Sequence, residues 1–583
     1  MSSAAQIVVL DAGGQYCHLI ARKVRDLGVY SEVRPSETAA AELAGAKGLI
    51  ISGGPSSVYD SASPTVDPGI FNGAAQVLGI CYGQQLMAHL LGGTVQPGEK
   101  GEYGLATLDL DGTHSALFAG ISGRQQIWMS HRDLVTRVPQ GFSVLGSTAT
   151  CAIAAIEAPA RGLYAVQFHP EVVHTTRGRD VLANFLFGIC GCQRDWDPRH
   201  RIAEIEQEIR RCVGGRSVFF FVSGGVDSTV ACALCQRALG EQRVRGVYVN
   251  TGLMREGETD YVRRMPGLSV ESAGPQFLGA LAGVCDPERK RHIIGEEFVR
   301  VQERIIQSRH LMDDHWILGQ GTIYPDTIES GGSQKAAVIK THHNRVPGIQ
   351  RLMDAGRIVE PLRSYYKDEV REIGRELGLP AGVLDRHPFP GPGLAIRCLC
   401  AETEAAVEAT SEGYVLPIRS VGVQGDSRSY AQVLSIDSLG IDSLDQARAS
   451  ELTNRIAGVN RVITCIEAAL PVSDMRVRPA SLTPARIARL RRADAIVRHL
   501  SHQSGFDRRI WQFPVVLIPL GSDAAPDSVV LRPVDSVDGM TAQSVSMPDS
   551  LLRSISSALL AVPGIAGVFY DLTHKPPATI EWE

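Results

Sequence analysis

Apolar runs alternate with amphipathic segments in the first third of the chain. The runs at 7–11 and 48–55 are typical of buried strands, and the segment 19–28 repeats apolar positions at helical spacing. The segment 76–93 begins as a strand and continues as a helix. Strands that alternate with helices predict a parallel sheet. We expect this unit to end near residue 192, where the polar stretch QRDWDPRH interrupts the pattern.

A second unit of the same kind follows. We expect a helix at about 200–212, a strand at 217–222 and another strand at 243–250. The first of these strands, SVFFFV, is apolar throughout, as in strands that are buried on both faces of a sheet. The two strands enclose the sequence VSGGVDSTVACALC at 222–235, in which two glycines precede the start of a helix.

The pattern becomes doubled from about residue 402. SYAQVLSID precedes a helix that leads to GVNRVITC at 458–465, and DSVVLRPVD precedes another helix that leads to VPGIAGVFYDL at 562–572. These halves indicate loosely repeated β-α-β elements. The sequence therefore predicts an α/β protein of two successive parallel-sheet domains, 1–192 and 193–401, followed by a doubled α+β module at 402–583.

Composition and charge narrow the class of protein. The 583 residues include 44% hydrophobic and 21% charged side chains, as in soluble globular proteins, and this length exceeds one hydrophobic core. The 58 Lys and Arg nearly balance the 63 Asp and Glu, so we do not expect nucleic acid as the main partner. There is no basic region before the short N-terminal apolar stretch and no run of about 18 apolar residues. We therefore expect a cytosolic protein without a membrane segment.

The 12 cysteines are too sparse for a disulfide scaffold in a chain of this length. Three closely spaced pairs occur, namely Cys190 and Cys192, Cys232 and Cys235, and Cys398 and Cys400. A zinc site would need four ligands at short spacings, and no second pair or histidine couple is close to any of them in the sequence. We therefore interpret all six as structural thiols.

One further cysteine lies in a pattern that favours catalysis. Gly79-Ile80-Cys81-Tyr82-Gly83 is a G-x-C-x-G sequence at a strand-to-helix junction, like the elbow that carries a nucleophilic serine in other enzymes. The start of a helix would also favour the thiolate. The alternative is a buried structural cysteine, which the flanking glycines and the preceding strand make the weaker interpretation.

A base for this cysteine is predicted in LYAVQFHPEV at 163–172. We expect this segment to be a strand, in which His169 and Glu171 point to the same face because side chains alternate with a period of two. The imidazole can accept the thiol proton while the carboxylate orients it. SGGP at 52–55 could supply backbone N–H groups to an oxyanion.

Residues 1 to about 192 resemble the class I glutamine amidotransferases through these motifs. The resemblance implies that the domain hydrolyses glutamine and releases ammonia. It also implies a triad of Cys81, His169 and Glu171 and an oxyanion site at the backbone of Gly54 and Tyr82. In SHRDLV, Arg132 occupies a position where this family usually has glycine, so the surface that signals between domains is expected to differ.

The glycine-rich sequence in the second domain predicts an anion site of another kind. It lacks the lysine of a Walker A loop, yet glycine N–H groups, hydroxyls and a helix start converge there. Asp227 beside a phosphate would be repulsive unless Mg²⁺ lies between them. A plain glycine-rich turn is the alternative.

The full sequence SGGVDST resembles the PP-loop of ATP pyrophosphatases. These enzymes cleave ATP between its α and β phosphates and leave an adenylylated substrate. The resemblance implies an ATP-binding loop and Mg²⁺ supplied with ATP and held at Asp227. The loop residues are Ser223, Gly224, Gly225, Val226, Asp227, Ser228 and Thr229.

The two activities on one chain resemble the family of GMP synthetases, as do DPERKRHIIGEEF, LGQGTIYPDTIES, VIKTHHN, RHPFPGPGLAIR and the tail KPPATIEWE. The reaction implied converts ATP, xanthosine monophosphate (XMP), glutamine and water into AMP, pyrophosphate, GMP and glutamate. The resemblance assigns XMP binding to Arg291, Asp474, Gln512, Lys575 and Glu581. It assigns a cationic lid to Lys340, His342 and His343.

Other functions are compatible with parts of the sequence. An NAD synthetase would share the loop but lack RHPFPGPG and the tail, and a lone glutaminase would not need ATP. A scaffold protein without activity would have lost some of Cys81, His169, Glu171 or Asp227, which are all present. The C-terminal region resembles the extended type of the animal enzymes, so a monomer and a homodimer both stay open. The tail itself is either a frayed terminus or, as Trp582 indicates, an anchored segment.

Overall fold

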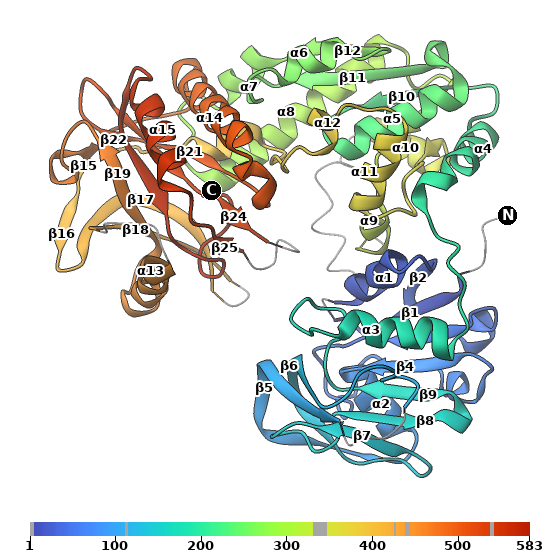
Figure 1. Ribbon diagram of the computed structural model, residues 1–583. Coiled ribbons are helices and arrows are strands. Elements are labelled where there is room, and N and C mark those ends of the chain that lie inside the picture. Colours follow the sequence, from blue (N-terminus) through green and yellow to red (C-terminus); the bar gives the residue numbers. More distant parts are fainter. Residues whose placement is uncertain are drawn as a thin grey trace. The chain divides into compact units, whose positions relative to one another are not determined.

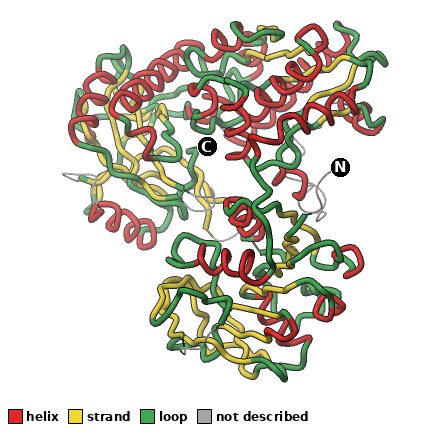
Figure 2. The backbone as a smooth tube through the Cα atoms, turned by 45° about the vertical axis from the view of Figure 1, so that its right-hand side comes forward, coloured by secondary structure: helices red, strands yellow, loops and turns green. Residues whose placement is uncertain are grey.

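The structure is a computed structural model that describes residues 5–14, 16–110, 115–329, 347–424, 427–437, 443–536 and 542–583. The chain divides into two compact units (Figure 1). The first comprises Met1–Arg201 and Tyr324–Ala337, and the second comprises Ile202–Ile323 and Val338–Glu583. Within each unit, helices accompany the strands (Figure 2). The two units are described separately.

The first unit contains one nine-stranded sheet in the order β2-β1-β3-β4-β9-β8-β7-β5-β6. The first five strands in this order are parallel, as the alternating pattern predicts, and the remaining pairs are antiparallel. The strands are β1 (Ile7–Asp11), β2 (Ser31–Pro35), β3 (Gly48–Ile51), β4 (Gln76–Ile80), β5 (Thr94–Leu110), β6 (Arg124–Arg137), β7 (Ser143–Ser147), β8 (Ala155–Ala158) and β9 (Leu163–Val166).

The helices of the first unit are α1 (Cys17–Asp26), α2 (Tyr82–Leu90), α3 (Gly178–Ala183) and α9 (Tyr324–Glu329). α1 packs against β1 and β2 and contacts α3, whereas α2 packs against β3, β4 and β9. α2 follows β4 directly and therefore begins at the carboxyl edge of the parallel strands. Binding sites of open α/β sheets occur at this edge.

The second unit begins with a fully parallel sheet in the order β12-β11-β10-β13-β14. Its strands are β10 (Ser217–Phe221), β11 (Val244–Asn250), β12 (Leu268–Ser272), β13 (Trp316–Gly319) and β14 (Ile358–Val359). The helices are α4 (Ile202–Val213), α5 (Val226–Leu239), α6 (Glu258–Arg263), α7 (Gly274–Ala280), α8 (Pro287–Ser308), α10 (Pro347–Asp354), α11 (Lys367–Glu376) and α12 (Ala381–Leu384). β10 is buried along nearly its whole length, as its apolar sequence predicts.

The C-terminal part of this unit has a seven-stranded sheet in the order β16-β17-β18-β19-β26-β23-β21. β18 pairs with β19 in parallel around α13, and β23 pairs with β26 in parallel around α15. β17 and β21 flank these pairs as antiparallel neighbours, and β19 meets β26 in the middle. The predicted doubling is therefore present as two β-β-α-β halves joined edge to edge.

The elements of these halves are β16 (Glu408–Thr410), β17 (Gly413–Gln424), β18 (Ser427–Ile436), α13 (Ser443–Arg455), β19 (Val459–Ala468), α14 (Pro484–Ser504), β21 (Val515–Ile518), β23 (Asp527–Leu531), α15 (Asp549–Leu560) and β26 (Ile565–Asp571). Short strands complete the part, namely β15 (Ala405–Ala406), β20 (Arg476–Val477), β22 (Leu520–Gly521), β24 (Val534–Asp535) and β25 (Gln543–Ser544).

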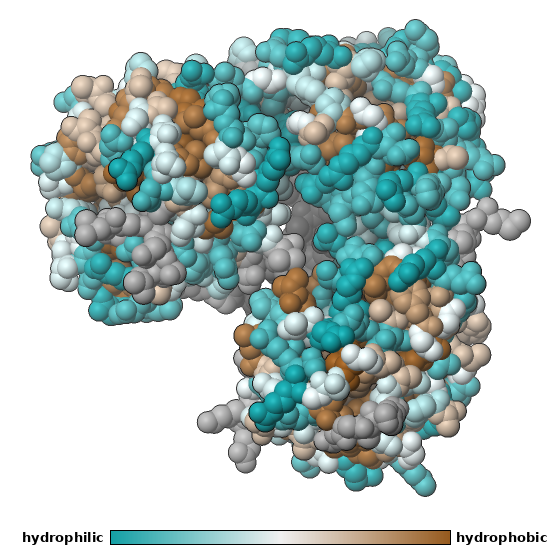
Figure 3. All heavy atoms as spheres, in the orientation of Figure 1, coloured by the Kyte–Doolittle hydropathy of each residue, from teal (hydrophilic) through white to brown (hydrophobic). Residues whose placement is uncertain are grey.

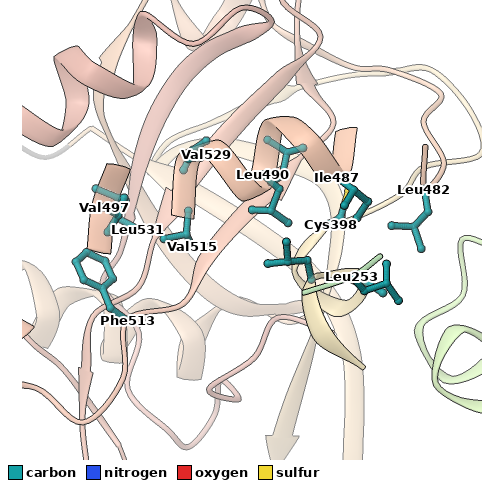
Figure 4. Close-up of a cluster of buried hydrophobic side chains, with 14 of the residues drawn as sticks. Leu253, Cys398, Leu482, Ile487, Leu490, Val497, Phe513, Val515, Val529 and Leu531 are labelled. Carbon is teal, nitrogen blue, oxygen red and sulfur yellow. The ribbon is translucent and has the colours of Figure 1, made fainter. Parts of the chain in front are cut away.

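Apolar side chains join the two largest sheets of the second unit into one core. Figure 4 shows Ile487, Leu490 and Val497 of α14 beside Val529 and other residues of the C-terminal sheet. The same cluster includes Leu253, which follows β11. The first sheet of this unit and the C-terminal module are therefore packed together rather than linked by chain alone.

Hydrophilic residues predominate on the face shown in Figure 3, with apolar residues interspersed. Within the described part of the chain, no helix is long and apolar enough to cross a membrane. Each of the 12 cysteines is a free thiol.

Candidate active sites

The elbow that carries Cys81 is built by close backbone contacts. Cys81 separates β4 from α2 with φ 54° and ψ -106°, a conformation that non-glycine residues rarely adopt. A Cβ atom on Gly79 would lie 2.6 Å from the carbonyl oxygen of Gly83, and one on Gly83 would lie 2.4 Å from that of Ile51. Both flanking positions therefore require glycine, because the helix start is pressed against the neighbouring strands.

His169 and Glu171 form a buried pair. Nδ1 of His169 lies 2.7 Å from Oε1 of Glu171, and both side chains are almost fully inaccessible. The prediction that they share one face of a strand is wrong, because β9 ends at Val166 and the two residues lie in the turn beyond it. The hydroxyl of Thr175 donates to the His169 carbonyl oxygen at 2.6 Å, which holds this turn.

The histidine faces the cysteine across Gly53. A Cβ atom on Gly53 would lie 3.0 Å from Cε1 of His169 and 3.5 Å from Cβ of Cys81. Burial by itself lowers the pKa of His169, but the carboxylate of Glu171 and the Cys81 sulfur raise it well above its usual range. The raised pKa therefore favours a protonated imidazole beside the Cys81 sulfur, which is the neighbour that a nucleophilic cysteine needs.

A cavity of about 920 Å³ opens over these residues. Its wall includes Cys81, His169, Gln85, the glycine pairs 13–14 and 53–54, and residues 130–133. Gly54 lies in this wall, and Tyr82 is the first residue of α2, whose first N–H groups have no partner within the helix. Of the predicted triad and oxyanion residues, the cavity wall therefore includes Cys81, His169 and Gly54, while Glu171 is hydrogen-bonded to His169 behind it and Tyr82 follows Cys81 in the chain.

Arg132 also lines this cavity and is exposed. Its neighbour Asp133 accepts a hydrogen bond of 2.6 Å from Ser57. Sequence reasoning placed Arg132 only on a signalling surface, whereas the structure places it in the wall of the cavity that contains Cys81.

The glycine-rich loop lies between β10 and α5, at the carboxyl edge of its parallel sheet. Gly224 has φ +77°, which glycine adopts without strain. The N–H of Gly225 donates to Oγ of Ser223 at 3.2 Å, and Oγ of Ser223 lies 3.2 Å from Oγ of Ser228. N–H and hydroxyl groups therefore converge at the start of α5, as in other phosphate cradles.

Two features of this cradle were not predicted. Nζ of Lys367, the first residue of α11, lies 3.4 Å from Oδ2 of Asp227. A Cβ atom on Gly321 would lie 2.7 Å from the amide nitrogen of Ser228, so the segment after β13 packs against the start of α5. Sequence spacing could not predict either contact, because the partners are far apart in the chain; Lys367, for example, is 140 residues from Asp227.

The structure brings Arg291 of α8 to the C-terminal tail, where its guanidinium donates to the Glu583 backbone. The adjacent Lys290 is fully buried and lies 2.6 Å from Oε2 of Glu583. The carboxylate of Glu581 accepts two hydrogen bonds, of 2.8 and 2.6 Å, from the buried Arg397. The contacts of Lys290 and Arg397 with the tail were not predicted, since isolated basic residues carry no motif of their own.

Two of the other predicted nucleotide residues, Gln512 and Lys575, lie beside the β24–β25 pair. Gln512 is buried and its N–H donates to the carbonyl oxygen of Val534 in β24, which pairs with β25. Lys575 pairs through its backbone with Ala542, just before β25. Asp474 is exposed in the 3-10 turn Val472–Asp474. The lid residues Lys340, His342 and His343 lie outside the described residues.

The tail is anchored rather than frayed. Trp582 is completely buried, its Nε1 donates to Asp571 at 2.9 Å, and the guanidinium of Arg461 lies 4.6 Å from the centre of its ring. The frayed-terminus interpretation is therefore wrong.

A dedicated metal cage is not present in the described part of the chain, which has no group of three or more His, Cys, Asp or Glu placed to hold an ion. A single carboxylate beside a phosphate cradle nevertheless suits Mg²⁺, which is commonly bound by one or two carboxylates together with substrate phosphates. Asp227 fits that role.

Three family profiles match the chain. Residues 8–189 match the class I glutamine amidotransferases, residues 199–264 match the NAD synthases, and residues 499–582 match the C-terminal domain of GMP synthases. The first match contains the cysteine elbow and the His-Glu pair, and the second contains the glycine-rich loop.

Several bacterial proteins match nearly the whole chain. A probable glutamine-hydrolysing GMP synthase of Leptospira interrogans is 41% identical, and the match covers 99% of each chain. Glutamine-hydrolysing GMP synthases of Syntrophomonas wolfei and Carboxydothermus hydrogenoformans are each 40% identical. The first of these matches covers 99% of each chain and the second covers 100% of each.

Proposed function

The chain belongs to the family of glutamine-hydrolysing GMP synthases, and we propose that its two sites divide the reaction between them. The Cys81 site releases ammonia from glutamine. The site at residues 223–229 and the C-terminal tail use ATP to activate XMP, which ammonia then converts into GMP. The observation that carries this proposal is the His169–Glu171 pair facing a strained Cys81 within one cavity.

The glutaminase half-reaction follows from the charge state of the triad. The Cys81 thiolate attacks the side-chain amide carbon of glutamine, and His169 gives its proton to the departing nitrogen, so that the C–N bond breaks and ammonia leaves. Water, deprotonated by His169, then cleaves the thioester to give glutamate. Glu171 keeps the imidazole oriented and stabilises its positive charge.

The backbone at Gly54 and Tyr82 would hold the negative oxygen of the tetrahedral intermediate. Gly54 lies in the cavity wall, and Tyr82 contributes the N–H at the start of α2, where the helix dipole favours negative charge. Both groups belong to the backbone, so they are held in place before the substrate arrives.

The second site would hold ATP by its phosphates. Residues 223–229 surround them with the Gly225 N–H and the hydroxyls of Ser223 and Ser228. The oxygen at C2 of XMP attacks the α phosphate, the bond to the β phosphate breaks, and pyrophosphate leaves. Ammonia then displaces AMP from the adenylylated intermediate and gives GMP.

Magnesium ion is the cofactor that this chemistry implies, with Asp227 as its protein ligand. Bound with ATP, it would neutralise charge on the departing pyrophosphate. Lys367 forms an ion pair with the carboxylate of Asp227 and would add a second positive charge near the phosphates.

The nucleotide half of the site would be formed by Arg291, Asp474, Gln512, Lys575 and Glu581, with Lys340, His342 and His343 as the cationic lid. Arg291 donates a hydrogen bond to the tail at Glu583, and Glu581 is a residue of the same tail, held by Arg397. Their position at one segment supports a shared role. The partners of the chain are then the small molecules glutamine, ATP and XMP. We further propose a cytosolic protein that acts as a monomer or a homodimer.

The test separates the two nitrogen donors. Cys81→Ala should reduce glutamine-driven GMP formation about 1000-fold or more, because the nucleophile is lost. Ammonium-driven formation should stay within about twofold of wild type. The measurement is the loss of the XMP ultraviolet signal with each donor, and Cys212→Ala, which removes an exposed thiol, is the matched control.

Equal loss with both donors would show that the sites are not separable and would reject the proposal. No nucleotide conversion by the wild-type protein with either donor would favour a lone glutaminase or an inactive scaffold. Conversion of a different acceptor in place of XMP would favour an NAD synthetase.

A further inference from the structure

A partly buried arginine in the sequence RHPFPGPG contacts the phosphate cradle from behind. Nη1 of Arg386 donates to the carbonyl oxygen of Gly224 at 3.1 Å, and Nη2 pairs with the carboxylate of Glu258. We propose that Arg386 is a positioning residue that keeps the N–H of the Gly224–Gly225 peptide turned toward the ATP phosphates. This inference rests on the proposed function of residues 223–229 as the phosphate site.

The geometry of one peptide unit carries the argument. In a trans peptide the carbonyl oxygen and the N–H point to opposite sides. The Gly224 carbonyl oxygen is taken by Arg386, so the Gly225 N–H points away from the guanidinium, and it donates to Oγ of Ser223 at 3.2 Å. That hydroxyl lies 3.2 Å from Oγ of Ser228, so the amide faces the interior of the cradle.

This peptide needs to be held because both of its residues are glycine. A flip of this peptide changes ψ of Gly224 and φ of Gly225, which is -74°, and glycine adopts either sign of φ with little penalty. A flipped peptide would present a carbonyl oxygen to the phosphates and withdraw a donor. The resulting repulsion would weaken ATP binding without any change in the residues that touch ATP. A charge-assisted hydrogen bond from Arg386 opposes that flip.

Arg386 is itself held in place by its surroundings. Oε2 of Glu258, at the start of α6, accepts a hydrogen bond of 3.1 Å from the Arg255 N–H, so the carboxylate has a defined position. Nε2 of the next residue, His387, lies 2.9 Å from the Asp507 carbonyl oxygen. Further along the segment, the Leu394 N–H donates to Leu253 at 2.8 Å. The guanidinium therefore approaches the loop on a fixed support.

The competing interpretation is a purely structural ion pair between Arg386 and Glu258, whose side chains are only 24% and 9% exposed. Loss of one member of such a pair destabilises the fold, because the other charge is left buried. Loss of both members together removes that penalty. A role in positioning the loop predicts a different result. The Gly224 carbonyl oxygen loses its donor whether Arg386 is removed alone or together with Glu258, so ATP binding should be weakened in both variants.

The experiment measures XMP-dependent exchange of pyrophosphate into ATP by the full chain, together with its melting temperature. Arg386→Ala should raise the apparent KM for ATP about tenfold or more and lower kcat less, because saturating ATP selects the binding-competent peptide orientation. Added methylguanidinium should lower that KM again, and Arg386→Lys should be intermediate. Arg375→Ala, which removes an exposed guanidinium paired with Asp385, should match wild type.

The double variant Arg386→Met with Glu258→Gln, which has no donor at position 386, separates the two roles. We expect its melting temperature to recover toward wild type while the KM for ATP stays high. A KM within twofold of wild type for Arg386→Ala, a recovered KM in the double variant, or no response to methylguanidinium would each overturn the inference. Absence of XMP-dependent exchange in the wild-type protein would instead overturn the proposed function.

Discussion

The charge of His169 in the proposed glutaminase site depends on the residues beside it. Burial opposes a charged imidazole at His169, and the charges of Glu171 and the Cys81 sulfur outweigh that effect. The raised pKa of His169 keeps the imidazolium present to a higher pH than a free histidine would allow. The carboxylate of Glu171 therefore supports the nucleophile indirectly, through the charge of His169.

Glu171→Gln should lower the pKa of His169, because the charge that raises it is lost while burial stays. The imidazolium then deprotonates at lower pH, so the alkaline limb of kcat/KM for glutamine hydrolysis should move to lower pH. We expect the rate at neutral pH to fall by about two to four orders of magnitude. A pH series of glutaminase assays measures both effects.

Glu42→Gln, an exposed substitution in the same unit, is the control for that series and should leave the profile unchanged. An alkaline limb in Glu171→Gln that coincides with wild type would mean that Glu171 does not set the charge of His169.

Strands of the C-terminal sheet place alternate residues in two different cores. Val515 and Leu517 of β21 belong to the cluster that contains α14, whereas Val516 and Ile518 belong to a second cluster with Trp582. Successive side chains of a strand point to opposite faces, so a sheet covered on both faces reads as a continuous apolar run. This explains why the doubled module shows no alternation of apolar and polar residues in β21 and β23.

A buried ion cluster links the central strands of that sheet. Asp571, the last residue of β26, accepts from Arg461 at 2.6 Å, lies 2.8 Å from Nη1 of Arg532 and accepts from Trp582 at 2.9 Å. Burial raises the pKa of Asp571, but the two arginines lower it further, so the net shift is downward. Burial also lowers the pKa of Arg461, to about 10.

Asp571→Asn should reduce the stability of this module by about 3–5 kcal/mol at neutral pH, because two buried guanidinium groups lose their counterion. The pKa of Asp571 is depressed in the folded state, so its contribution is complete above the unfolded value of about 3.9 and is lost as pH falls through the folded value. The difference between variant and wild type should therefore be constant from pH 7 to about pH 4 and narrow below. Hydrogen exchange of β26 peptides measures it.

Asp523→Asn is the matched control, since Asp523 pairs with Arg478 while 85% exposed, and it should change stability by less than about 1 kcal/mol. A gap for Asp571→Asn that widened on acidification would contradict the downward shift in pKa.

At the scale of the whole molecule, one compact unit is built from segments that are far apart in the sequence. The first compact unit includes Tyr324–Ala337, which lies within the predicted second domain. Tyr324 accepts a hydrogen bond of 2.5 Å from Val33 of β2, and the Arg25 guanidinium lies 4.8 Å from the centre of its ring. The three predicted domain ranges stay a prediction, although the three large sheets lie within them.

Deleting residues 575–583 should raise the KM for XMP steeply and reduce synthesis from either nitrogen donor. The deletion removes Glu581, which Arg397 holds, and Trp582, which fills the second core of the sheet. Glutamine hydrolysis measured without nucleotide should survive, because the proposed triad of Cys81, His169 and Glu171 lies in the other compact unit. Circular dichroism and steady-state kinetics with each donor measure the effects.

Lys575→Ala is the milder companion, which leaves the tail anchored. If Lys575 meets the nucleotide phosphate, its loss should weaken XMP binding by about 1.5–3 kcal/mol. Unchanged XMP affinity in both variants, with folding intact, would remove the tail from the nucleotide site.

Short motifs and local periodicity were sufficient to predict much of the fold and several features of the candidate sites. The parallel sheets, the cysteine elbow, the phosphate loop and the doubling of the C-terminal module depend on neighbouring residues, whose spacing follows from strand and helix geometry. Even the strand wrongly extended to residue 172 left the His169–Glu171 pair correct, because residues two apart can meet in a turn as well as on a strand face.

Only the tertiary structure could show which distant group each of four cationic side chains contacts. These contacts are Lys367 with Asp227, Arg397 with Glu581, Arg386 with the Gly224 carbonyl oxygen, and Lys290 with Glu583. These partners are 140 to 293 residues apart, and a lone arginine or lysine has the same appearance in sequence whether it is solvated or buried. Their roles arise where the chain buries a charge and must supply its counterion or acceptor from another element. Residue spacing encodes local backbone geometry, whereas these charge partners are chosen by packing.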